Sequence, residues 1–246
     1  MKRIHVPQVN VRYWLAITFA SLFGTNLGDY YAHASGLSLQ AGLGVLAAIV
    51  AVVFLLERRD ARPHEVYYWL AILIIRTGAT NIADFLNFRA GLPAQLVSGG
   101  LVVLLGLLAT GMTLLAQRDT SERTRRLPKT GGLYWAAMLT AGVLGTVLGD
   151  DVSHALGQGV TAIALGLLLG GMLPLTRWGL ASIFAYWATV GVARTAGTAM
   201  GDWLAERQGL NLGLPVSMLI TGGAFVLILM LWRPREARGN AVASTG

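Results

Sequence analysis

The sequence contains no cysteine among its 246 residues. This absence excludes disulfide bonds, thiolate metal ligands and redox centres built on sulfur, and it leaves the redox compartment undetermined. The chain also lacks a Gly-x-Ser-x-Gly element, a His-Glu-x-x-His motif and a glycine-rich phosphate loop. These absences argue against a serine hydrolase, a zinc protease and a nucleotide-dependent enzyme, so we do not expect enzymatic activity.

Charged residues are scarce as well, at 13% of the chain, whereas soluble domains carry about a quarter. Hydrophobic residues make up 54%, and they form blocks of roughly the 20 residues that a helix needs to cross a bilayer. Such blocks occur at 41–56, 97–116 and 215–232. We therefore predict a polytopic membrane protein whose main partner is the lipid bilayer.

The formal net charge is +7, but the distribution of the basic residues argues against a nucleic-acid partner. Fifteen of the 19 Lys and Arg residues lie at the N-terminus, in the connections around 57–65, 117–130 and 177, or after residue 232. The opposite loops contain only Arg89 and Arg207. By the positive-inside rule, this asymmetry predicts cytoplasmic termini and an even number of spans.

One pattern occurs four times: a Trp is followed, fifteen residues later, by an Asp among small residues. The copies run from Trp14 to Asp29, from Trp69 to Asp84, from Trp135 to Asp150 and from Trp187 to Asp202. The first apolar segment carries the same pattern as three internal segments. We therefore interpret it as part of the fold and not as a signal peptide.

Each copy is followed by a turn and then by a plainer apolar segment that returns across the membrane. The turns are marked by Gly36, Gly91, Gly157 and Gly209. The predicted helices are 12–34, 38–56, 66–88, 94–116, 132–155, 159–176, 179–206 and 213–232, and the sixth is expected to end near Pro174. The predicted fold class is an all-α integral membrane protein with eight transmembrane helices in four helical hairpins.

The four copies form two kinds. The first and third carry Asp-x-x-x-His, and the second and fourth carry an Arg eight residues before the Asp. This alternation predicts two parallel halves related by a pseudo-two-fold axis along the membrane normal. The expected organisation is a first membrane half at 1–116, a polar cytoplasmic linker at 117–130, a second half at 131–232 and a disordered cytoplasmic tail at 233–246.

The local strings around the four Asp residues are GTNLGDYYAH, ATNIADFLNF, GTVLGDDVSH and GTAMGDWLAE. In these strings the chain resembles a bacterial family of uncharacterised integral membrane proteins built from four copies of a short repeat centred on Gly-x-x-x-Gly-Asp. The resemblance covers nearly the whole chain, although Ala79 and Ala83 replace the glycines of the second copy. It implies eight spans in a bacterial inner membrane and brings no settled activity.

Two stripes follow each Asp-bearing helix. The first is a small-x-x-x-small stripe, which lets helix backbones approach closely in lipid. The second is polar, with residues four apart on one helix face. It consists of Thr25, Asp29 and His33; Arg76, Thr80 and Asp84; Thr146, Asp150 and His154; and Arg194, Thr198, Asp202 and Glu206. Close packing through the first stripe would bring these polar faces together at the bundle centre.

A charged side chain in hydrocarbon costs about 2.5 kcal/mol or more, so this stripe needs a partner, water or a substrate. Our first hypothesis is transport of a divalent metal cation. Its expected ligands are Asp29, His33, Asp150, His154, Asp202 and Glu206. Oxygen and nitrogen ligands suit Mn²⁺, Zn²⁺, Fe²⁺, Co²⁺ or Ni²⁺, and the absence of Cys disfavours Cu(I). No other cofactor is expected.

Two alternatives remain open. One is a proton-coupled carrier of an organic, in one version anionic, substrate held by Arg76 and Arg194. Its further substrate or coupling residues would be Asp84, Asp151, Thr25, Thr80, Thr146 and Thr198. The other is a non-transporting structural protein in which the two Arg residues neutralise acidic groups. A homodimer is compatible with all three hypotheses.

Each of the four repeat Trp residues directly follows a Tyr. We interpret these Tyr-Trp pairs as an aromatic belt at the cytoplasmic membrane boundary. A helix rises about 1.5 Å per residue, so each Asp lies about 22 Å further along than its Trp. The Asp residues are therefore expected in the outer third of the membrane, with Arg76 and Arg194 near its midplane.

Overall fold

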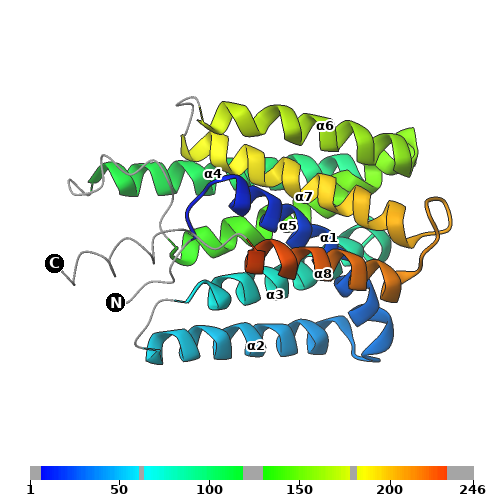
Figure 1. The fold of residues 1–246 in the computed structure, drawn as a ribbon, viewed down its shortest axis with the longest axis horizontal. Coiled ribbons are helices and arrows are strands. Elements are labelled where there is room, and N and C mark those ends of the chain that lie inside the picture. Colours follow the sequence, from blue (N-terminus) through cyan, green and yellow to red (C-terminus); the bar gives the residue numbers. More distant parts are fainter. Residues whose placement is uncertain (1–6, 61–63, 119–129, 178–181, 232–246) are drawn as a thin grey trace.

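The computed structural model describes residues 7–60, 64–118, 130–177 and 182–231, and these ranges are helical with short connections. In chain order the elements are α1 (Val11–Ala34), α2 (Leu39–Arg59), α3 (Glu65–Asp84), the π-helix η1 (Phe85–Arg89), α4 (Ala94–Arg118), α5 (Gly132–Leu156), α6 (Gln158–Arg177), α7 (Ile183–Ala205) and α8 (Leu214–Leu231). Figure 1 shows these helices running roughly side by side. The predicted linker lies largely, and the predicted tail wholly, outside the described residues.

Local sequence signals account for most helix ends. Asn10, Ser38 and Ser182 cap the N-termini of α1, α2 and α7 by accepting a hydrogen bond from a backbone N–H of the first turn. Three of the four predicted turn glycines adopt a left-handed backbone, with φ of 63° at Gly36, 62° at Gly91 and 86° at Gly157.

Two sequence predictions need correction: the glycine that marks the fourth turn, and the end of the sixth helix. In the fourth turn the positive φ values fall on Asn211 (55°) and Gly213 (76°), and not on Gly209. There, backbone hydrogen bonds from Leu210 to Trp203 and from Leu212 to Leu204 extend the turn and move its left-handed positions further along the chain. The sixth helix continues through Pro174 to Arg177, so the proline does not end it.

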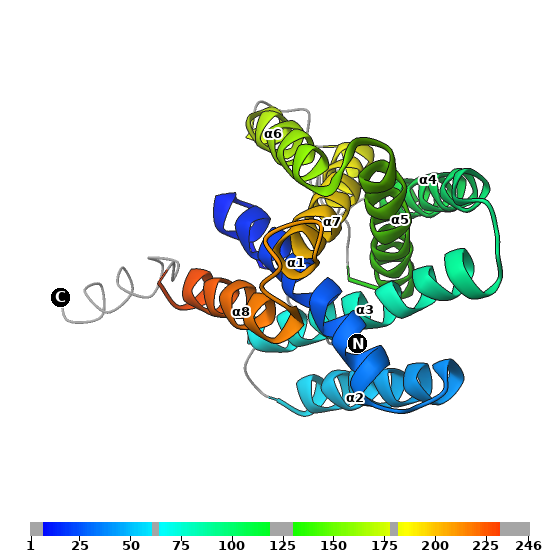
Figure 2. The same cartoon turned by 90° about the vertical axis from the view of Figure 1, so that its right-hand side faces the viewer.

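The four Asp-bearing helices α1, α3, α5 and α7 form an inner bundle. They pack in cyclic order, since α1 contacts α3, α3 contacts α5, α5 contacts α7, and α7 contacts α1. Figure 2 shows them near the centre, with α2, α4, α6 and α8 outside. Tyrosines from the N-terminal ends of all four inner helices meet, so these helices run in the same direction.

Short connections follow α1, η1, α5 and α7 in the described residues, and the outer helices are displaced around the bundle. The main partner of each outer helix is the inner helix of the following copy: α2 packs on α3, α4 on α5, α6 on α7, and α8 on α1. Of the outer helices, α6 also makes substantial contact with its own inner partner α5. Neighbouring copies therefore interlock around the bundle.

Small residues allow the inner helices to approach closely. A Cβ atom at Gly24 would lie 2.5 Å from Cγ of Arg76, and one at Gly145 would lie 2.5 Å from Cβ of Arg194. One turn later, Gly28 meets Thr80 and Gly149 meets Thr198 in the same way. The small-residue stripe is therefore where α1 meets α3 and where α5 meets α7.

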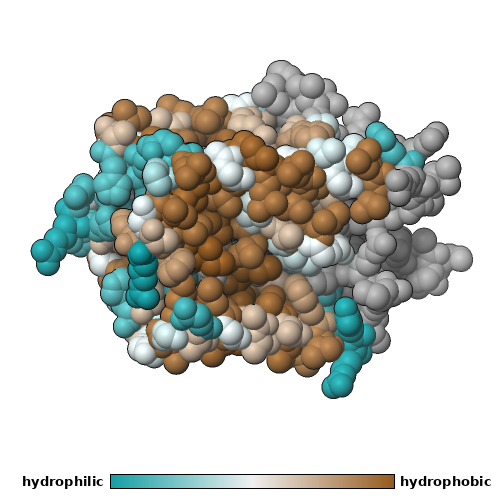
Figure 3. Space-filling view, turned by 180° about the vertical axis from the view of Figure 1, so that it is seen from behind, coloured by the Kyte–Doolittle hydropathy of each residue, from teal (hydrophilic) through white to brown (hydrophobic). Residues whose placement is uncertain are grey.

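The outer helices expose apolar side chains. Large hydrophobic residues on their surfaces include Leu55, Leu107, Leu167 and Leu219, and Figure 3 shows a broad hydrophobic face with hydrophilic residues toward its ends. Among the described residues, five helices are long and apolar enough to cross a membrane: Leu39–Arg59, Glu65–Arg89, Ala94–Gln117, Gly132–Leu156 and Leu214–Leu231. These apolar helices indicate a membrane protein.

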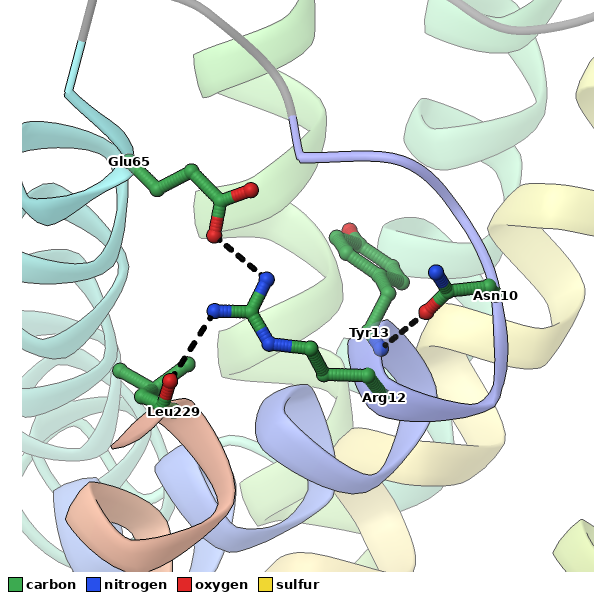
Figure 4. A network of polar contacts seen from close by, with 5 residues as sticks. All are labelled: Asn10, Arg12, Tyr13, Glu65 and Leu229. Atoms are coloured by element: carbon green, nitrogen blue, oxygen red, sulfur yellow. Dashed lines mark hydrogen bonds and ion pairs between the residues drawn. The ribbon is translucent and has the colours of Figure 1, made fainter. Parts of the chain in front are cut away.

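The start of α1 is joined to the start of α3 and the end of α8 (Figure 4). Nη1 of Arg12 forms an ion pair with Oε2 of Glu65 at 2.7 Å, and Nη2 donates to the carbonyl of Leu229 at 3.3 Å. The first and last described helices therefore begin and end at the same end of the bundle.

Candidate functional site

The four repeat aspartates line one cavity at the C-terminal end of the inner bundle. It has a volume of about 470 Å³, and the four threonines that precede these aspartates by one helical turn also line it. Its lining residues are Thr25, Asp29, His33, Thr80, Asp84, Phe88, Arg89, Thr146, Asp150, Ser153, His154, Gln158, Thr198, Asp202, Ala205, Glu206, Gln208 and Leu214. Every inner helix contributes a threonine and an aspartate.

Most of the predicted site residues meet in this cavity. Three do not line it: Asp151, Arg76 and Arg194. Asp151 instead accepts a hydrogen bond from Nε2 of Gln95 on α4, at 3.4 Å. The two arginines lie deeper in the bundle, where both side chains are almost completely buried.

The two histidines lie at the exposed rim in matching positions. Nδ1 of His33 is 2.7 Å from the carbonyl oxygen of Asp29, and Nδ1 of His154 is 2.8 Å from that of Asp150. A carbonyl oxygen only accepts, so Nδ1 carries the proton in both rings. In the neutral form, Nε2 is then the nitrogen that could bind a ligand.

The predicted metal ligands share the cavity without converging on one point. Within the described part of the chain, no three His, Asp or Glu side chains lie close enough to hold a metal ion. At the rim, Nε2 of Gln158 donates to Oε2 of Glu206, so this predicted ligand is held by a neighbouring amide.

Below the aspartates, Arg76 joins the four inner helices. This fully buried side chain extends from α3, and Nη1 donates to Oγ1 of Thr146 at 2.7 Å and to the carbonyl oxygen of Gly142 at 2.9 Å. Nη2 donates to Oγ1 of Thr25 at 2.5 Å and of Thr198 at 2.6 Å. Its terminal nitrogens thus bond to α1, α5 and α7 at once.

Arg194 occupies the equivalent position of α7 but points the other way along the bundle. Its Nη2 is 3.7 Å from Sδ of Met138, which lies on the side away from the cavity. Nε and Nη1 have no hydrogen-bond partner among the described residues, although the side chain is only 1% exposed. The two guanidinium groups therefore extend toward opposite ends of the bundle.

Beyond Arg194, four tyrosine hydroxyls form a closed ring of hydrogen bonds. The oxygen–oxygen distances are 2.8 Å from Tyr13 to Tyr68, 2.7 Å from Tyr68 to Tyr134, 2.9 Å from Tyr134 to Tyr186 and 2.6 Å from Tyr186 to Tyr13. All four side chains are buried, and each comes from a different inner helix.

The repeat tryptophans pack around this ring in the same cyclic order. The ring centroids are 5.8 Å apart for Trp69 with Tyr13, Trp135 with Tyr68, and Trp14 with Tyr186, and 5.4 Å apart for Trp187 with Tyr134. Trp14, Trp69 and Trp187 are at most 3% exposed. The predicted aromatic belt is therefore wrong for these three residues, which belong to the bundle core, whereas Trp135 is half-buried at its edge.

A sequence signal for the tyrosine ring was present. In each copy the tyrosine lies sixteen residues before the aspartate, which is four steps of the spacing that defines the polar stripe. The stripe in α1 thus extends back from Asp29 through Thr25, Ser21 and Ile17 to Tyr13. An apolar residue at some of these positions, such as Ile17, makes the continuation of the stripe hard to recognise in the sequence.

The second copy departs from the others just after its aspartate. Where α1 and α5 continue as α-helix to a histidine, the chain forms the π-helix η1 and brings Phe88 and Arg89 to the cavity. A π-turn inserts one extra residue and so changes the direction of the following side chains. Arg89 was not among the predicted site residues, and it is the only Lys or Arg of the described residues that lines the cavity.

The ion pairs of the described region do not neutralise the aspartates of the cavity. Arg12 pairs with Glu65, and His64 pairs with Asp60 at 3.8 Å. Arg76 donates to hydroxyl and carbonyl oxygens and not to a carboxylate. The fold and site thus define an all-helical protein with membrane-like helices and an acidic cavity at the C-terminal end of its inner bundle.

The comparison with protein families identifies the repeat. The family model described as Repeat of Unknown Function (DUF347) matches residues 12–62 and 185–237. These segments contain the first and fourth Trp-to-Asp patterns, so the chain carries an internal repeat of a family of unknown function. No curated protein and no solved structure matches the chain.

Proposed function

We propose that this protein is a membrane transporter of a small cationic solute that binds in the acidic cavity. The observation that carries the proposal is the composition of the lining. Five carboxylate side chains face the cavity, and Arg89 is the only Lys or Arg among its lining residues. Ionisable groups that face a cavity inside a membrane protein mark a solute pathway, and this set favours a positive charge.

The direction of the inner helices adds to the negative field. All four run in parallel, and their C-terminal ends surround the cavity. Each helix C-terminus carries a partial negative charge of about half an elementary charge. Four such ends around one cavity stabilise a cation there and disfavour an anion.

The divalent metal hypothesis remains one version of this proposal. A cavity of about 470 Å³ is larger than a bare ion requires, so a metal would bind with part of its water shell. A small organic cation also fits, because ligand pockets range from about 300 to 1,000 Å³. The anionic-substrate version is less well supported, because neither Arg76 nor Arg194 lines the cavity.

The finer features predicted from sequence belong to the same proposal. We propose four repeat copies centred on Gly-x-x-x-Gly-Asp, eight spans, and cytoplasmic termini in a bacterial inner membrane. The cyclic packing of α1, α3, α5 and α7 supports four related copies. The contact of Arg12 with Leu229 supports an even number of spans. The crowded carboxylates would allow proton coupling, because close acidic groups titrate together.

The decisive experiment compares a double variant of two cavity aspartates with a variant of an aspartate that lies outside the cavity. Purified wild-type protein in liposomes should take up a cation from a panel of Mn²⁺, Zn²⁺, Co²⁺, Ni²⁺ and organic amines. The double variant Asp29→Asn/Asp150→Asn should bind that cation at least about tenfold more weakly, a difference of about 1.4 kcal/mol. Asp151→Asn is the matched control, because Asp151 does not line the cavity.

Two results would contradict the proposal. One is the absence of binding and uptake for every cation in the panel by the folded wild type, which would favour the structural hypothesis. The other is an equal loss of binding in the double variant and in Asp151→Asn. That result would attribute binding to the general surface charge.

A further inference from the structure

The oxygen atoms that accept hydrogen bonds from Arg76 form a set that is suited to a guanidinium group. Its two terminal nitrogens donate to three threonine hydroxyls and one backbone carbonyl, at 2.5 to 2.9 Å. These acceptors come from α1, α5 and α7, while the arginine comes from α3. A guanidinium group is planar and carries N–H donors in a fixed fork, and these oxygens surround the end of that fork.

The threonine hydroxyls are oriented as acceptors by their own helices. Oγ1 of Thr25 donates its hydrogen to the carbonyl of Ser21 at 2.9 Å, and Oγ1 of Thr198 donates to the carbonyl of Arg194 at 3.3 Å. Thr146 bonds to Gly142 in the same manner at 3.4 Å. A hydroxyl has one hydrogen and two lone pairs, so each can still accept an N–H bond at the bundle centre.

The threonines that carry these oxygens border the acidic cavity, and their side chains are almost completely buried. Thr25, Thr146 and Thr198 line it, together with the aspartates that follow them by one helical turn. A cation that enters between the carboxylates therefore lies about one helical turn from hydroxyls that already bind a guanidinium group of the protein itself.

This arrangement suits an organic N–H donor better than a bare metal ion. No three His, Asp or Glu side chains of the described residues converge to coordinate a metal. Distributed N–H donors can instead bond to separated oxygens, with the carboxylates supplying charge at longer range. Such a ligand uses the threonine layer and the aspartates at the same time.

We propose that the threonine layer, formed by Thr25, Thr146 and Thr198 with the carbonyl of Gly142, is a binding site for guanidinium-type organic cations. Arg76 occupies this layer as a tethered group of the same chemistry, and the transported cation competes with it. The inference rests on the proposed function and names its substrate class.

The first test is chemical rescue of Arg76→Ala by guanidinium. Millimolar guanidinium chloride, which is far below the molar range that denatures proteins, should raise the Tm of this variant by about 3 °C or more. Arg194→Ala is the matched control, because that side chain makes no bond to the threonines. Tetramethylammonium, which has the same charge but no N–H donor, should leave both variants unchanged.

The proposal is overturned if guanidinium fails to raise the Tm of Arg76→Ala, or raises that of Arg194→Ala equally. Adding Thr146→Val and Thr198→Val to Arg76→Ala should abolish the rescue. A rescue that persists without these hydroxyls would place the bound guanidinium elsewhere and would also overturn it.

A second measurement uses the wild type and does not depend on the folding of any variant. In liposomes, guanidinium or methylguanidinium should inhibit uptake of a transported cation at concentrations at least tenfold lower than tetramethylammonium. Equal inhibition by both would refute the guanidinium site and leave cation transport standing. A wild type that moves no cation at all would refute the proposed function, and rescue of Arg76→Ala would then still decide whether the layer binds guanidinium.

Discussion

Arg76 and Arg194 occupy equivalent positions in two copies of the repeat, yet their guanidinium groups meet different surroundings. Arg76 extends to the threonine layer, and Arg194 extends to Met138 on the side of the bundle away from the cavity. The two side chains project into the bundle centre from opposite helices, α3 and α7. Their positive charges would repel each other there. Extending in opposite directions separates the two charges while both side chains stay buried.

At the residue scale, we predict that Thr198→Val destabilises the protein. The change keeps the shape of the side chain but removes an acceptor from the buried guanidinium of Arg76. Losing one partner of a buried hydrogen bond to a charged group costs about 1–3 kcal/mol, which thermal unfolding in detergent should record as a lower Tm.

Thr110→Val is the control for this prediction. Thr110 also donates to a carbonyl of its own helix, at 2.8 Å from Gly106, but it is exposed on α4. Its replacement should change the Tm little. Equal effects of the two substitutions would mean that the bond to Arg76 contributes nothing specific.

The polar residues of the cavity were predictable from sequence, and the tyrosines were not correctly interpreted. Asp29 and Thr25 stand out because polar residues at a spacing of four are rare in apolar segments. Tyr13 follows the same spacing, but a Tyr beside a Trp near a helix start also fits a membrane boundary. Sequence alone did not distinguish a core position from a boundary position, because an amphipathic ring suits both.

At the scale of single helices, close backbone approach dominates the inner bundle. We predict that Gly24→Ala lowers stability by about 1–3 kcal/mol, because added atoms in a well-packed core force neighbours to move. The new Cβ would lie 2.5 Å from Cγ and 2.9 Å from Cβ of Arg76. Thermal or denaturant unfolding of the purified variant would measure the loss.

Gly44→Ala provides the matched control on α2. A Cβ there would meet no atom within 4 Å, and alanine favours a helix over glycine by about 0.5–1 kcal/mol. We expect this variant to be as stable as the wild type or slightly more stable. A comparable loss in both variants would contradict the close approach of α1 to α3.

Helix positions were also largely predictable, because caps, turn glycines and apolar length define them locally. The exceptions involve effects that local rules do not contain. The π-helix η1 follows α3 where the other copies continue as α-helix, and α6 continues through Pro174. A proline removes one backbone hydrogen bond, and packing of α6 against α7 can offset that loss.

At the scale of the whole molecule, the copies are joined by their outer helices. Because α4 packs on α5 and α8 packs on α1, the outer helices form two separate interfaces between the two sequence halves. The packing partners of the outer helices could not be assigned from the sequence. The outer helices present similar apolar surfaces, and apolar contacts carry little directional information.

We therefore predict that the protein assembles from two separately expressed halves. One chain that ends at residue 118 and a second chain that starts at residue 130 should co-purify when they are produced together. Both interfaces, α4 with α5 and α8 with α1, can still form between them. Each half alone should be recovered poorly, since its exposed inner helices lack their covering partners. Affinity purification through a tag on one half measures the outcome, and failure to recover the untagged half would contradict the interlocked arrangement.

The tyrosine ring has a consequence for the movement of protons along the bundle. Each of its four hydroxyls has a single hydrogen, and the ring contains four hydrogen bonds. All four hydrogens are therefore used within the ring, and none points along the bundle toward Arg194 or away from it. A proton that reaches this level has no onward donor while the ring is closed. In this conformation the bundle can concentrate positive charge at one end without conducting it to the other.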